Sequence, residues 1–194
     1  HIIDALPEIT AALDQENWLQ AARGIMTTDT RSKITSRQIE IEGTTVTLTG
    51  IAKGAGMIQP DMATMLAYVA TDGLAGQEFL KSVLQAAADQ SFNRITVDGD
   101  TSTNDSCMLT ATGVSGVDLG DPDVAGKFQT ALNSLTRELA HAVIRDAEGA
   151  TKFVEVRVEG GQSVDDCLKI AYSIANSPLM KTALFASDAN WGRI

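Results

Sequence analysis

Apolar residues recur three and four positions apart in five stretches of the chain, a spacing that places them on one face of an α-helix. These stretches predict amphipathic helices over residues 4–13, 17–25, 76–92, 121–146 and 163–175. The fourth is the longest, and its apolar stripe runs from Phe128 to Val143. The first two are short and adjacent, so we expect them to pack as a pair.

Alternation of apolar and polar residues predicts a β-hairpin in the first half of the chain. Residues 38–41 and 44–49 alternate, and the turn signal Glu42-Gly43 lies between them. The apolar run over residues 65–70 ends at a turn and is typical of a buried strand. Two further strands are expected over residues 109–117 and 154–159. Strands interleaved with helices imply a mixed α/β fold.

Composition narrows the class of protein. The 194 residues are 44% hydrophobic and 21% charged, enough apolar content for one large domain or two small ones with a real core. The net charge of -10, with no cluster of Lys or Arg, argues against a nucleic-acid or membrane partner. No apolar run approaches the roughly 20 residues that span a bilayer. The two cysteines, Cys107 and Cys167, lack zinc-site or disulfide spacing, so we expect free thiols in a reducing cytoplasm.

A glycine-punctuated segment joins the hairpin to the buried strand. Gly54 and Gly56 can fold the backbone sharply and point amides at a bound group, and Lys53 adds a positive charge. Thr64 opens the apolar run that follows, and we interpret it as a nucleophile anchored by that strand. A Gly-x-Gly beside a lysine is, by itself, more often a tight turn next to a surface cation.

Two other polar features suggest chemistry. Residues 94–106 contain three aspartates at the near-alternate spacing of a calcium loop, but the position that requires a glutamate, counted from Asp98, is Leu109. The metal interpretation therefore fails, and an active-site loop or a turn remains. His141 is an isolated helical histidine, which is usually structural or exposed, so a Ser-His-Asp triad lacks a base.

Four segments together resemble the bifunctional ornithine acetyltransferase / N-acetylglutamate synthase family of arginine biosynthesis. The central segment matches that family's Lys-Gly-x-Gly-Met-Ile and Met-Ala-Thr-Met-Leu motifs. The chain departs from the family at Arg31-Ser32-Lys33, where Pro-Lys is common, and at residues 186–189. The matching segments are residues 25–30, 53–66, 97–105 and 145–153.

The resemblance implies a precursor that cleaves itself between Ala63 and Thr64. Residues 1–63 would then be the C-terminal part of the α chain and residues 64–194 the N-terminal part of the β chain, so this would be an interior piece of a longer precursor. Together they would form one mixed α/β core of layered sheets covered by helices, the ornithine acetyltransferase / DmpA-like fold. The two products would assemble as an α2β2 heterotetramer in the cytoplasm.

The resemblance also assigns a reaction and its residues. Thr64 would carry acetyl from N-acetylornithine to glutamate in a ping-pong cycle, with its own freed α-amino group as base. Thr27 would contact substrate, Lys53 would attract the substrate carboxylate and Glu148 its cationic end. The oxyanion hole would lie upstream of this chain. No metal or cofactor is expected, and acetyl-CoA is left open as a second acetyl donor.

Two rivals stay open. An N-terminal-nucleophile amidase or aminopeptidase of related fold would share self-cleavage and Thr64 but would release the acyl group to water. A non-enzymatic binding domain would keep the Ala63-Thr64 bond intact and form no acetyl adduct.

Overall fold

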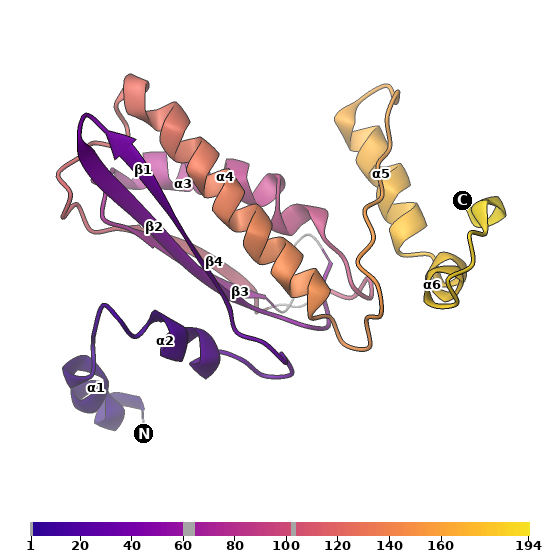
Figure 1. Ribbon diagram of the computed structural model, residues 1–194, viewed down its shortest axis with the longest axis horizontal. Coiled ribbons are helices and arrows are strands. Elements are labelled where there is room, and N and C mark those ends of the chain that lie inside the picture. Colours follow the sequence, from indigo (N-terminus) through magenta and orange to yellow (C-terminus); the bar gives the residue numbers. More distant parts are fainter. Residues whose placement is uncertain (1, 60–64, 102–103) are drawn as a thin grey trace.

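The structure is a computed structural model that describes residues 2–59, 65–101 and 104–194. The described chain forms one four-stranded sheet flanked by helices (Figure 1). The strands are β1 (Lys33–Ile41), β2 (Thr44–Lys53), β3 (Leu66–Thr71) and β4 (Ser106–Ala111). The helices are α1 (Ile2–Ala11), α2 (Trp18–Gly24), α3 (Gln77–Asp89), α4 (Pro122–Arg145), α5 (Val164–Ala175) and α6 (Pro178–Phe185), with short 3-10 helices η1 (Phe92–Arg94) and η2 (Trp191–Arg193). None of the described helices is long and apolar enough to cross a membrane.

The sheet has the order β1-β2-β3-β4. β1 and β2 form the predicted hairpin, and Glu42 and Gly43 both have positive φ, at 50° and 82°. Positive φ at both central residues is the type I′ geometry that matches the twist of a hairpin. β3 pairs antiparallel with β2, and β4 pairs parallel with β3 after the crossover through α3.

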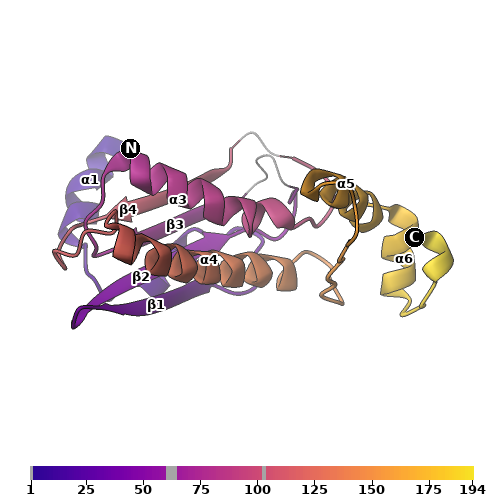
Figure 2. The ribbon, with the colours of Figure 1, turned by 90° about the horizontal axis from the view of Figure 1, so that it is seen from above.

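Helices α3 and α4 lie side by side over one face of the sheet (Figure 2). β2 turns alternate residues toward this face, and Gly50 is among them. A Cβ at Gly50 would lie 2.7 Å from a Leu135 methyl, so the glycine permits the close approach of α4 to the sheet. The long helix therefore reaches the far end of β2, where Lys53 lies. The apolar residues that α4 buries are Val124, Phe128, Ala131, Leu132, Leu135, Leu139, Ala140 and Val143.

Three predicted elements differ from the structure. Residues 154–159 form no strand, because none of the described strands lies beside them to supply a hydrogen-bonded ladder, and Val154 is 42% exposed. The strand expected over residues 109–117 is β4, which begins earlier and ends before Gly113 and Gly116, both with positive φ. The expected pair of N-terminal helices does not form a packed unit, because α1 buries no residue and α2 packs on β1 and β2 instead.

The other predicted elements match the structure closely. The hairpin, the buried strand β3 and helices α3, α4 and α5 all lie where the apolar periodicity places them. Asp121 accepts a hydrogen bond from the Asp123 amide at the start of α4, and Ser163 accepts one from the Asp166 amide at the start of α5. Figure 1 shows α5 and α6 extending past the end of the sheet where α4 ends.

Candidate functional site

Three of the predicted site residues meet around the turn that follows β2. Lys53 is the last residue of β2 and is only 7% exposed. Its ammonium donates a long hydrogen bond, 3.5 Å, to the hydroxyl of Thr27, which comes from the loop after α2. The Glu148 amide donates to the Ala55 carbonyl at 2.7 Å. The structure therefore brings Thr27, Lys53 and Glu148 to one place, although up to 121 residues separate them.

The two glycines of this turn have different roles. Gly54 has φ +146°, a conformation that a residue with a side chain rarely adopts. Gly56 does not have a positive φ. The second residue of this turn with a positive φ is Met57, at 58°. A Cβ at Gly56 would lie 3.1 Å from the carboxylate of Glu148. The glycine at this position is therefore what allows Glu148 to lie against the turn.

Thr64 and the Ala63-Thr64 bond lie outside the described residues. The chain on either side of them is held by the polar loop that the sequence left as either active site or turn. Asp98 accepts hydrogen bonds from the amides of Met57 (2.5 Å) and Ile58 (3.0 Å). Asp105 accepts one from the Met65 amide (2.6 Å). These aspartates thus bind backbone amides, and the described residues include no group of three or more His, Cys, Asp or Glu side chains that could hold a metal ion.

The charges near the turn are not evenly balanced. Burial raises the pKa of Asp105 to about 6, although the Met65 amide and the Lys53 ammonium both oppose that rise. Among the described residues, no carboxylate oxygen lies within 4.0 Å of the Lys53 nitrogen. A buried ammonium with one weak partner favours the binding of an anionic group.

A buried ion cluster lies directly behind the turn, and the sequence analysis missed it. The Lys33 ammonium is 2.5 Å from Asp29 and 2.6 Å from Asp146. Asp29 also accepts hydrogen bonds from the amides of Gly54 (2.7 Å) and Thr27 (3.2 Å). Burial opposes ionisation of Asp29, but these donors outweigh it and hold its pKa below the ordinary value.

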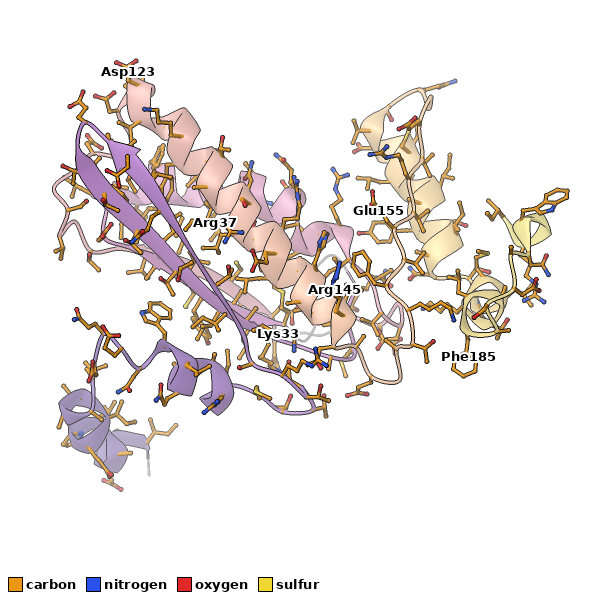
Figure 3. The ribbon with its side chains drawn as sticks, viewed as in Figure 1. Lys33, Arg37, Asp123, Arg145, Glu155 and Phe185 are labelled. Carbon is orange, nitrogen blue, oxygen red and sulfur yellow. The ribbon has the colours of Figure 1, made fainter. Side chains whose placement is uncertain are left out.

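Asp146 is the second carboxylate of this cluster and follows the last residue of α4. It accepts hydrogen bonds from the amides of Thr30 (3.0 Å) and Arg31 (3.3 Å) and from the Thr30 hydroxyl. Burial opposes its ionisation too, but Lys33 and Thr30 together lower its pKa. Figure 3 shows Lys33 at the end of the sheet where α4 finishes at Arg145. The one local sign of this cluster in the sequence was that Lys33 lies two residues after Arg31, in the segment where the chain departs from the family motif.

A cleft of about 680 Å³ begins at Glu148 and continues between the end of α4, α5 and α6. His141 lies on its wall and stacks edge-on against Phe153, with ring centroids 5.2 Å apart. The Arg145 guanidinium covers the same ring at 4.2 Å. Burial, then the charges of Arg145 and Arg137, lower the pKa of His141. These contacts give His141 a packing role.

Comparison with known proteins identifies the family. The ArgJ family model matches residues 1–194, the whole of this sequence. The chain belongs to the ArgJ family. This confirms the family that the motifs around Lys53 and Glu148 predicted.

Curated ArgJ relatives are similar along the whole chain. The "Arginine biosynthesis bifunctional protein ArgJ" of Pseudomonas fluorescens is 52% identical over 96% of this chain and 47% of its own length. The protein of the same name from Methylococcus capsulatus is 55% identical over 98% of this chain and 47% of its own length. The chain therefore spans about half the length of the curated ArgJ relatives it matches.

A solved ArgJ structure supports the fold. The crystal structure of "Arginine biosynthesis bifunctional protein argJ" from Bacillus halodurans aligns with a TM-score of 0.61 at 43% identity, and the match covers 65% of this chain and 60% of that one. The mixed α/β class predicted from the sequence is confirmed.

Proposed function

We propose that this chain is part of an acetyltransferase that moves acetyl from N2-acetyl-L-ornithine to L-glutamate, with Thr64 as the nucleophile after self-cleavage at Ala63-Thr64. The observation that carries the proposal is the pairing of opposite charges around one turn. Lys53 offers a buried ammonium and Glu148 a carboxylate that lies against Gly56. N-Acetylornithine has the complementary pair, an α-carboxylate and a side-chain ammonium.

The substrate would bind through these charges. Its carboxylate would pair with Lys53, whose hydrogen bond to Thr27 is long and readily exchanged. Its side-chain ammonium would pair with Glu148, which lies at the mouth of the cleft. Thr27 is exposed and would donate its hydroxyl to the same substrate. The donor's acetyl group would then be directed to Thr64.

The chemistry needs one nucleophile and one base. The freed α-amino group of Thr64, with a reference pKa of about 7.7 to 8.0, would accept the hydroxyl proton as the oxygen attacks the acetyl carbonyl. The protonated amine would return that proton to the leaving nitrogen of ornithine. The glutamate amine would then attack the acetyl-threonine ester and regenerate the hydroxyl. In self-cleavage, the same oxygen would attack the Ala63 carbonyl, and water would open the resulting ester.

The sheet supports continued association of the cleaved parts. β1 and β2 precede the proposed bond, and β3 and β4 follow it, yet β2 and β3 pair from Leu48 opposite Thr71 to Lys53 opposite Leu66. α4, from the second part, packs on β1 and β2. Cleavage would therefore leave one sheet built from two chains.

We further propose the α2β2 assembly, a cytoplasmic location, and acetyl-CoA as the second acetyl donor of the bifunctional enzyme.

Kinetics on the full-length protein test the transferase proposal. Initial rates over N-acetylornithine and glutamate should give the parallel lines of a ping-pong cycle, and Thr64→Ala should abolish both transfer and self-cleavage. Acetyl release that continues at full rate without glutamate would instead indicate the amidase. An uncleaved protein without transfer would indicate a binding domain.

A further inference from the structure

Lys33 is a buried lysine that the proposed reaction does not use. Its side chain is 2% exposed, and its ammonium contacts two carboxylates, Asp29 and Asp146. In the register of the hairpin, Lys33 lies opposite Ala52, the neighbour of Lys53. Successive strand residues face opposite sides, so Lys33 lies on the α4 side of the sheet and Lys53 on the other. Lys33 therefore does not face the proposed substrate site, and it acts on that site through Asp29 and Asp146.

One of those groups controls the Lys53 side of the site. The Asp29 oxygen that accepts from Lys33 also accepts from the Gly54 amide at 2.7 Å. The other oxygen of Asp29 accepts from the Thr27 amide at 3.2 Å. Asp29 thus holds two backbone segments in place. One is Gly54, the neighbour of Lys53, and the other is Thr27, whose hydroxyl contacts the Lys53 ammonium.

The other group controls the Glu148 side. Asp146 follows the last residue of α4 and lies two residues before Glu148. Its contact with Lys33, 2.6 Å, ties the end of the helix to the start of β1. The backbone of Glu148 is then bound to Ala55, one residue beyond Gly54. Among the described residues, Lys33 is accordingly the cation that contacts the carboxylates of both halves of the site.

We infer that Lys33 is a positioning residue that sets the separation of Lys53 and Glu148, and through it the preference for a substrate with a side-chain ammonium. The inference rests on the proposed function. Without Lys33, two buried carboxylates face each other without a counter-charge, and their repulsion moves the Thr27 loop away from the end of α4. The separation of Lys53 and Glu148 then changes, so the two charges no longer pair as well with the two ends of one substrate.

The test compares two acetyl donors that differ in one group. N-Acetylnorvaline has the carbon skeleton of N-acetylornithine but lacks its ammonium. The measurement is the ratio of kcat/KM for the two donors in the full-length, self-cleaved protein. In Lys33→Met we expect this ratio to fall by about 10- to 100-fold, the loss of one hydrogen bond to a charged group. A purely structural role would lower both rates and leave the ratio unchanged.

Arg37→Met is the matched control. Arg37 lies on the same strand and pairs with Glu138 of α4 at 2.5 Å, but both side chains are partly exposed. In Arg37→Met, the ratio of kcat/KM for the two donors should equal that of the wild type. If Lys33→Met does not fold, Asp146→Asn replaces it, because it removes the charge by which Lys33 ties the end of α4 to β1, while the amide oxygen can still accept from Thr30. The weaker tie should lower the ratio for this variant too.

The outcomes separate the two proposals. A folded variant of the cluster, at Lys33 or at Asp146, with the wild-type ratio would overturn the positioning role. A wild-type protein with no preference for N-acetylornithine would overturn the proposed function itself.

Discussion

Glu148 donates its amide to the carbonyl of Ala55 at 2.7 Å, and this contact fixes a residue from the end of α4 against the turn that follows β2. The carboxylate of Glu148 also lies only 3.1 Å from the position that a Cβ at Gly56 would take. The carboxylate of Glu148, a residue from the second half of the chain, therefore lies beside the turn that follows Lys53. This single relationship unites the motif around residue 54 with the motif around residue 148.

Gly56→Ala tests that relationship. The added methyl would lie 3.1 Å from the Glu148 carboxylate, so the carboxylate must move. We expect kcat/KM for N-acetylornithine to fall about 2- to 10-fold, less than the roughly 100-fold cost of a 1 Å misplacement, with little loss of stability. Gly76→Ala is the control, because no atom lies within 4 Å of its Cβ position. Equal activity of both variants would contradict the packing argument.

Thr27→Val removes the one described hydrogen-bond partner of the Lys53 ammonium while keeping the shape of the side chain. We expect KM for N-acetylornithine to rise about 2- to 10-fold, because the substrate loses the hydrogen bond that the Thr27 hydroxyl would donate to it. The neighbouring Thr28→Val, which is also exposed, should leave KM unchanged. Steady-state kinetics on both variants would decide the point.

Lys33→Met should destabilise the protein by about 3–5 kcal/mol, because it leaves two buried carboxylates without their cation. Arg37→Met should cost at most about 1 kcal/mol, because its ion pair is exposed. The pKa values of Asp29 and Asp146 are lowered in the fold, so their stabilisation is present above the ordinary pKa of 3.8 and is lost as the pH falls below it. Denaturant titrations of both variants at neutral and acidic pH measure these differences, and a Lys33→Met stability equal to that of Arg37→Met would refute the prediction.

Asp105 predicts the opposite dependence. Its pKa is raised from 3.8 to about 6, so the folded protein binds this proton more tightly than the unfolded chain. The free energy of unfolding should therefore decrease, for this group, as the pH rises from about 4 to about 6. Asp105→Asn should remove that slope. A difference between wild type and variant that stays constant over this range would show that Asp105 titrates normally.

The sequence predicted the elements whose own apolar periodicity identifies them, whatever part of the chain they pack against. The Glu42-Gly43 hairpin and the stripe of α4 are of this kind, because the turn residues and the helical spacing of apolar residues are visible in the sequence itself. Residues 154–159 show the limit, since alternation reports a preference for a strand but not whether a partner strand exists beside it. Pattern alone could not distinguish the two cases.

The site was predicted from motifs and the cluster behind it was not. Lys53 and Glu148 each lie in a segment that resembles the family, which drew attention to them individually. The contact between Lys33 and Asp146 joins residues 113 apart, and the local sequence of neither residue indicates the other as its partner. Such a contact follows only from the hairpin register and the length of α4, which set where the strand and the helix end.

The most direct test of the account is the intact mass of the full-length protein, purified fresh, after N-acetylornithine, and after a glutamate chase, beside Thr64→Ala. The proposed acetyl-threonine mechanism predicts two chains divided at Ala63-Thr64, an acetyl group on the chain that begins with Thr64, and loss of that group on adding glutamate. The variant should remain a single unmodified chain. A wild-type protein that stays uncleaved and unacetylated would contradict the account.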